Sequence, residues 1–199
     1  MKFPDAIDRA AVRILWTRLG LVNALRLGVR ITRRADRGEP FNDLPPAEGF
    51  KEIGSRAQAG SAILLYEELV RMGREDALAI TSECVSKGAV LFLSQSIGRI
   101  DRSVLAAMSA DEQRSWLDGV SAKFPNATLT WDEVSPDRVK FTVSACRLHT
   151  LALYAGHPEL APVFCKGDGA FFSGEGVSLK RPGTLAEGAE SCPFTLTFE

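Results

Sequence analysis

The sequence predicts an α+β protein, with a helical N-terminal half followed by a small antiparallel sheet that contains an inserted helix. Two patterns support this. Apolar residues recur at helical spacing through roughly the first 120 positions, and strict apolar/polar alternation replaces that spacing in three later segments. The chain has 199 residues, which fits one domain over 1–199 with enough length to bury its own core.

The N-terminal half contains four expected helical regions and one loop. Residues 5–35 form the first region, with Gly20 and Gly28 as points of interruption. Three prolines and two glycines in 36–49 predict a loop. Residues 56–72 and 75–98 are the next two helices, and Cys84 lies among apolar neighbours in the second, as a small core residue would. Ser109 and Glu112 have the spacing of a capping box that begins the fourth.

The C-terminal part, residues 126–199, is expected to hold the sheet and the site. Alternation predicts strands at 126–132, 138–146 and 193–198, with one apolar face and one face of Thr and Ser side chains. Pro158 stands where a helix would begin, because the first helical position needs no N–H donor. By this parity Cys146 falls on the Thr/Ser side of its strand and Cys192 on the apolar side.

Charge is distributed unevenly, although the net charge is −1. Residues 1–37, a basic helical segment, carry +6, and the remainder carries −7. This segment is expected to pack on the acidic body of its own chain or of a second copy in a homodimer; contact with an anionic membrane surface or a partner protein is the alternative. We expect no transmembrane segment, no secretory signal, no nucleic-acid partner and a cytoplasmic location, where thiols stay free, catalytic or metal-bound.

Three of the four cysteines lie in the last 54 residues: Cys146 at a strand end, Cys165 in the inserted helix and Cys192 before the last strand. A sheet with an inserted helix can bring these positions together. If the helix continues to Asp168, Cys165 and Asp168 share one of its faces at i, i+3. We therefore expect Cys146, Cys165 and Asp168 to line one cavity, with Cys84 elsewhere.

The stretch from Cys146 to Phe194 resembles the C-terminal signature of the L-2-amino-thiazoline-4-carboxylic acid hydrolase family. The matching positions are Cys146, the run 156–160, Cys165, Asp168, Arg181, Thr184, Gly188, Cys192 and Phe194. Pro193 departs from the pattern, since family members often have Asp after the last cysteine. The family is in turn distantly similar to the 4-vinyl reductase and Bet3-like ligand-binding domains.

The resemblance implies a hydrolase that opens a cyclic amidine-like C–S or C–N bond. Cys165 is then the expected nucleophile, ahead of Cys146, because Asp168 is its neighbour and could bind the amidinium or activate water. Arg181 is the expected partner of the substrate carboxylate. Arg147 and Lys166, each beside a cysteine, are further substrate-binding candidates.

Two other hypotheses stay open. Cys146, Cys165, Cys192 and Asp168 could hold zinc or iron, although no cofactor is expected from their wide spacing. The same scaffold could instead be a non-enzymatic accessory protein that binds an apolar or tetrapyrrole-like ligand or a partner enzyme.

Overall fold

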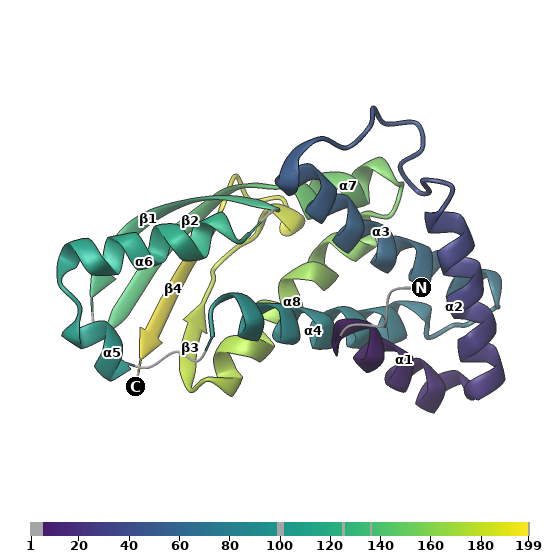
Figure 1. Cartoon of the computed structure of the whole chain (residues 1–199), viewed down its shortest axis with the longest axis horizontal. Helices are drawn as coiled ribbons and strands as arrows, with labels where there is room; N and C mark the ends of the chain where they lie inside the picture. Colours follow the sequence, from purple (N-terminus) through teal and green to yellow (C-terminus); the bar gives the residue numbers. More distant parts are fainter. Residues whose placement is uncertain (1–5, 99–101, 125, 136, 199) are drawn as a thin grey trace.

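A computed structural model describes residues 6–98, 102–124, 126–135 and 137–198, without the side chains of Arg102 and Leu105. The molecule is elongated, with the sheet at one end and a helical hairpin at the other (Figure 1). Helices α4, α7 and α8 connect the two ends. The predicted α+β class is confirmed, with helices first and an antiparallel sheet after them.

The first predicted helical region is two helices, α1 (Ala6–Leu19) and α2 (Leu21–Ala35). Gly20 separates them with a φ of 78°, in the left-handed region that favours glycine, whereas Gly28 lies inside α2. The predicted loop follows, up to the start of α3 (Gly49–Arg71), which begins seven residues earlier than predicted. Leu15, Leu27 and Ile80 are buried in the core that these helices share with α4.

Helix α4 (Ala77–Ser96) is the central helix of this half, in contact with α1, α3 and α8. By length and composition alone it could cross a membrane. In this fold α4 packs against three helices, and its Glu83 pairs with Arg18 of α1 at 2.7 Å.

Helices α7 and α8 join the helical half to the sheet. Helix α7 (Arg147–Tyr154) follows directly on the second strand, and a single 3-10 turn, η1 (Pro158–Leu160), leads into α8 (Ala161–Gly174). Helix α8 lies so close to α4 that a Cβ built on Gly167 would come 2.2 Å from the Cβ of Ala89. Gly167 is therefore required for this contact.

The sheet has four strands in the order β1-β2-β4-β3, and every neighbouring pair is antiparallel. The strands are β1 (Ala127–Ser135), β2 (Arg138–Cys146), β3 (Val177–Lys180) and β4 (Cys192–Phe198). Three match the predicted strands, and β3 is an additional one. It has only four residues, too few for alternation to show.

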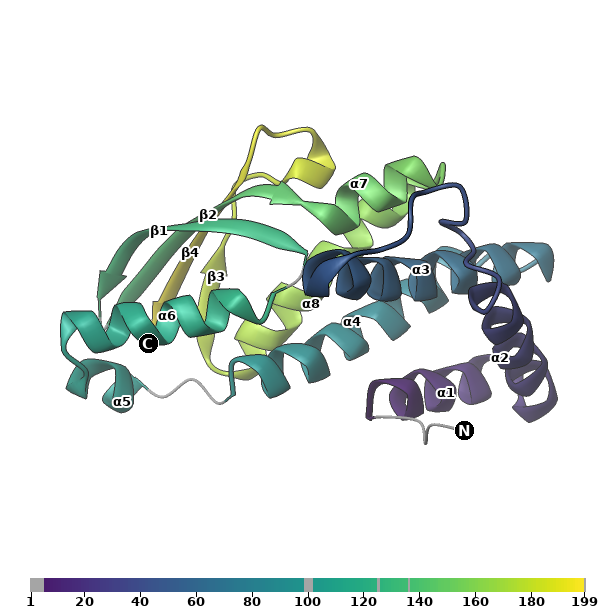
Figure 2. The same cartoon turned by 45° about the horizontal axis from the view of Figure 1, so that its top comes forward.

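Helices cover the apolar face of the sheet. Helix α5 (Arg102–Ala107) precedes α6 (Ala110–Ala122), whose predicted capping box between Ser109 and Glu112 is confirmed. Figure 2 shows α6 lying along the inner side of the curved sheet. There Trp116 packs with buried side chains of the strands and of α8, among them Val139, Leu196 and Phe171.

Candidate functional site

The residues of the C-terminal signature converge where the sheet meets α7 and α8. Cys146 ends β2 and is the N-cap residue of α7, while Cys192 begins β4. Cys165 and Asp168 lie in α8, and Arg181 follows β3. The charges of Asp168 and of the other two thiols act on Cys165, so these side chains lie within electrostatic range of one another. We call these five residues the cysteine cluster.

The side of the sheet on which Cys146 lies differs from the prediction. Leu129 pairs with Val143, but its neighbour Thr128 pairs with Ala145, so β2 has one extra residue at Ser144. This β-bulge reverses the alternation for the rest of the strand. Cys146 therefore packs beside Val143, Cys192 and Phe194 rather than among the Thr and Ser side chains. The prediction that Cys192 lies on the apolar side is confirmed, and the residue is buried there.

Arg181 connects α8 to the sheet. Its Nη1 donates to Oδ2 of Asp168 at 2.7 Å, and its Nη2 donates to the backbone carbonyl of Cys165 at 3.0 Å. The guanidinium also lies over the ring of Phe194, 4.9 Å from the ring centroid. Such a cation–π contact fixes the plane of an arginine. Arg181 is thus held on one face of α8, the face that Cys165 and Asp168 share as predicted.

The segment between Arg181 and Cys192 closes the cluster. Thr184 is buried and donates to Oε2 of Glu187, and this contact stabilises the 3-10 turn η2 (Leu185–Glu187). Gly188 ends the turn with a φ of 88°. The turn also directs the backbone N–H of Leu185 to the sulfur of Cys192, at 3.1 Å. Thr184 and Gly188, both in the signature, therefore shape the loop that positions Cys192.

The surroundings of Cys165 favour the protonated thiol. Its Sγ donates to the carbonyl of Ala161 one turn earlier, at 3.8 Å. Burial raises the pKa of Cys165 to about 12; Arg181 opposes this, while Asp168 and the other two cysteines add to it. Cys84 in the helical core has its pKa raised to about 12 by burial as well. In this respect Cys165 resembles a structural thiol.

The surroundings of Cys146 differ in one respect. Burial raises the pKa of this thiol too, but the backbone N–H groups of His149 and Leu148, in the first turn of α7, oppose the rise. N–H groups at a helix N-terminus stabilise a thiolate. Unlike Cys165, Cys146 thus has a sulfur that faces backbone N–H donors, as Cys192 does through Leu185.

Asp168 is held in a mostly nonpolar setting beside these thiols. Burial raises the pKa of this carboxyl above its usual value, and the ion pair and hydrogen bond with Arg181 oppose the rise. The side chain keeps 29% of its surface exposed. A carboxyl with a raised pKa that solvent can still reach is suited to exchange protons.

Two predicted substrate-binding residues lie outside this arrangement. Arg147 makes a two-pronged pair with Glu52 of α3, with Nε and Nη2 each 2.8 Å from a carboxylate oxygen. Lys166 is exposed on α8. The Arg147–Glu52 pair instead fastens the start of α7, and with it Cys146, to the helical half. Glu52 and Phe194 were not predicted as site-supporting residues; Phe194 belongs to the signature, but Glu52 gives no local signal.

Among the described residues, no group of three or more His, Cys, Asp or Glu side chains is arranged to hold a metal ion. An open hollow of the described structure lies elsewhere, on α1. A metal at the cluster, and a cavity lined by Cys146, Cys165 and Asp168, stay predictions.

The fold and the cluster define an α+β protein with a cysteine-rich site between its sheet and α7–α8. The sequence model of the L-2-amino-thiazoline-4-carboxylic acid hydrolase family matches residues 54–196, and the chain belongs to this family. The match covers α3 from residue 54 onward, so Glu52 lies just outside it. It includes every residue of the cysteine cluster. No curated protein matches the chain.

Proposed function

We propose that the protein hydrolyses a small cyclic amidine of the 2-amino-thiazoline carboxylate class at the cysteine cluster. The observation that carries the proposal is the convergence of thiols, a carboxyl and a guanidinium from four separate elements in a region that matches a hydrolase family. These groups correspond to the needs of such a substrate. Its amidine carbon accepts a thiolate, and its carboxylate pairs with an arginine.

In the proposed reaction Cys146 is the nucleophile. Its thiolate attacks the ring carbon between sulfur and nitrogen, the ring C–S bond breaks, and the ring sulfur takes up a proton and leaves as a thiol. Water then adds to the same carbon, and the bond to Cys146 breaks. The balance is one water consumed, one carbamoyl product formed and the enzyme thiol regenerated. The N–H groups of Leu148 and His149 support this choice over Cys165.

Asp168 and Arg181 have complementary roles in this proposal. Asp168 binds the amidinium of the substrate and afterwards takes the proton of the attacking water. Two of the five N–H groups of Arg181 are used in the hydrogen bonds to α8, and the others are available for the substrate carboxylate. Phe194 keeps the guanidinium in its plane, so the carboxylate meets it in a fixed direction.

A direct test is incubation of the purified protein with 2-amino-thiazoline-4-carboxylate, followed by measurement of the released thiol and of the product mass. Hydrolysis adds 18 mass units, that of one water, and releases one thiol per turnover. Cys84→Ser, which changes the buried thiol outside the cluster, is the matched control and should keep full activity. Absence of thiol release from this and related cyclic amidines would contradict the proposal.

A second function rests on a different observation. The raised pKa values of Cys146 and Cys165 and the mutual neutralisation of Asp168 and Arg181 also suit a closed site that binds a ligand without chemistry. The accessory hypothesis predicts binding of an apolar or tetrapyrrole-like molecule with no turnover. Two measurements on protein purified without an affinity metal column separate the hypotheses. A bound chromophore in the absorption spectrum would support the accessory role. Stoichiometric zinc or iron in a metal analysis would support a metal site.

A further inference from the structure

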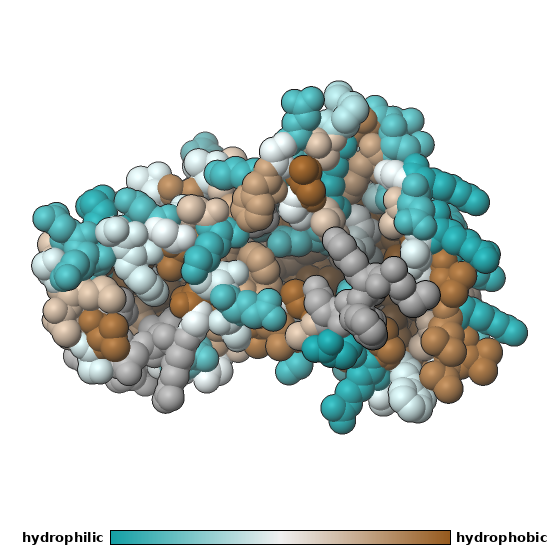
Figure 3. Space-filling view, in the orientation of Figure 1, coloured by the Kyte–Doolittle hydropathy of each residue, from teal (hydrophilic) through white to brown (hydrophobic). Residues whose placement is uncertain are grey.

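Helices α1 and α2 expose an unusual amount of apolar surface. Six large side chains on them are between 48% and 60% exposed: Val12, Trp16, Leu21, Val22, Leu25 and Val29. Figure 3 shows hydrophobic side chains gathered at the end of the molecule formed by α1 and α2, with hydrophilic ones beside them. A contiguous apolar surface of this kind marks an interaction site. It lies outside the part of the chain that matches the hydrolase family.

Helix α2 has three distinct faces. Ala24 and Leu27 are buried against the rest of the helical half. Since each residue turns the helix by about 100°, Leu21, Leu25 and Val29 form a second stripe that points away from the buried face. A third stripe of arginines runs directly beside the apolar one: Arg26, Arg30 and Arg33. Exposed apolar and exposed cationic side chains therefore run in parallel along one helix.

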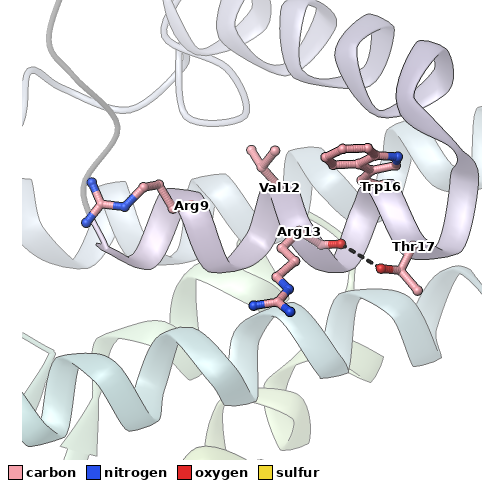
Figure 4. Close-up of a pocket in the computed structure, with 5 residues that line it drawn as sticks. All are labelled: Arg9, Val12, Arg13, Trp16 and Thr17. Atoms are coloured by element: carbon pink, nitrogen blue, oxygen red, sulfur yellow. Dashed lines mark hydrogen bonds between the residues drawn. The ribbon is translucent and has the colours of Figure 1, made fainter.

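Helix α1 extends this surface. Val12 and Trp16 point to the same side of the helix, and Arg9, Arg13 and Thr17 complete the lining of an open hollow there (Figure 4). Trp16 is the largest exposed aromatic side chain of the described structure. Tryptophan beside arginine and aliphatic residues is typical of helices that lie in a membrane interface.

We propose that the α1–α2 surface docks on an anionic lipid bilayer. The charge of +6 on residues 1–37 complements acidic headgroups, and the apolar stripe is positioned to enter the acyl boundary. Arg13, Arg26 and Arg33 are exposed and have no carboxylate partner among the residues that the structure describes, so their charge is available to lipid. A symmetric dimer through the same surface is the competing occupant, and the oligomeric state distinguishes it.

Vesicle co-sedimentation tests this. The full-length protein should bind vesicles that contain phosphatidylglycerol, should bind neutral phosphatidylcholine vesicles at least tenfold more weakly, and should be released by high salt. Trp16 fluorescence should shift to the blue on binding, and Trp16→Phe should remove that shift.

Matched variants locate the surface. Val29→Gln should weaken binding about tenfold, whereas Val70→Gln, at an equally exposed valine of α3, should not change it. Arg26→Gln and Arg33→Gln should each weaken binding about fivefold, with Arg114→Gln on α6 as the neutral control. Leu25→Gln is a second apolar variant, and circular dichroism verifies folding. Equal binding to neutral vesicles, no binding at all, or a lipid-free dimer that buries Trp16 would overturn the proposal.

Discussion

Two nearly buried arginines differ in what surrounds them. Arg34 of α2, with 11% of its side chain exposed, pairs with Glu39, Glu67 and Glu68. Arg181, with 15% exposed, pairs with one carboxylate, that of Asp168. Arg34 therefore lies in a network of several carboxylates and cations, which includes Arg30 and Arg71, whereas Arg181 forms a single ion pair. Arg34 donates to carboxylates from all three of its side-chain nitrogens and holds helices together, whereas Arg181 donates from two, and this difference suits the ligand role proposed for Arg181.

The surroundings of Arg34 also extend further. Glu68 is additionally paired with Arg71, and Glu67 receives His157 from the loop before α8 at 3.0 Å. Burial would raise the pKa of Glu67, but its hydrogen bonds with Arg34 and His157 hold that pKa below its usual value. This network fastens the α1–α2 hairpin to the part of the chain that carries the cysteine cluster.

The largest expected effect separates Cys146 from Cys165. Cys146→Ser should lower turnover at least about a thousandfold without changing the fold, because the hydroxyl is hardly ionised at neutral pH. Cys165→Ser should retain most of the activity, since its sulfur bonds the carbonyl of Ala161 as a structural thiol would. Steady-state kinetics of both variants, with Cys84→Ser as control, makes the comparison. Loss of activity in Cys165→Ser alone would reverse the assignment.

The next effect tests Arg34 and its ion pairs. Arg34→Met should lower the free energy of unfolding by about 4 kcal/mol, because it removes the central cation of a largely buried network and leaves Glu39 without its partner. Arg71→Met is the control, since that side chain is 55% exposed and should cost less than about 1 kcal/mol. Urea denaturation measures both. Similar losses for the two variants would show that the network does not act as a buried unit.

A third prediction concerns the contact that positions α8. Gly167→Ala should cost about 3 kcal/mol, because its Cβ would overlap that of Ala89. Gly169→Ala, with nothing within 4 Å of its added Cβ, should be neutral or stabilising. Adding Ala89→Gly to Gly167→Ala should restore most of the stability. Thermal melts of the three variants test this, and failure of the rescue would contradict the contact.

The smallest effect is a pH dependence at the support of Cys146. The hydrogen bond with Arg147 is the main reason that the pKa of Glu52 is lowered from 4.5 to about 2. Because the folded state lowers this pKa, the stabilisation is present above about pH 4.5 and is lost as the pH falls toward 2. We expect a loss of about 1–2 kcal/mol after solvent screening. Denaturation curves measured from pH 6 to 2.5 give the free energy of unfolding at each pH. This free energy should fall less steeply with decreasing pH in Glu52→Gln than in the unchanged protein. An equal dependence on pH in the two proteins would contradict the assignment.

The sequence predicted the features that depend on local pattern. Helical spacing and alternation located the long helices and three strands, and Ser109 with Glu112 located a helix start. The sharing of one α8 face by Cys165 and Asp168 also followed from spacing, since the helix does continue past Asp168. These features are set within one or two turns of chain, so the residues concerned carry the information themselves.

Features that depend on distant contacts could not be predicted in this way. The extra residue at Ser144 moved Cys146 to the apolar side, and no sequence signal marks that bulge. Arg147 stands beside Cys146 in sequence, but Glu52, 95 residues earlier, takes up its guanidinium. The choice between Cys146 and Cys165 as nucleophile likewise depends on where α7 begins and on the backbone groups that each sulfur meets.

The most direct test of Cys146 as nucleophile is mass spectrometry of the protein quenched with acid during turnover of 2-amino-thiazoline-4-carboxylate. Peptide mapping should find the ring-opened substrate attached to the peptide that carries Cys146, and this adduct should disappear when the substrate is exhausted. The peptide that carries Cys165 should stay unmodified. An adduct on Cys165, or full turnover by Cys146→Ser, would contradict the account.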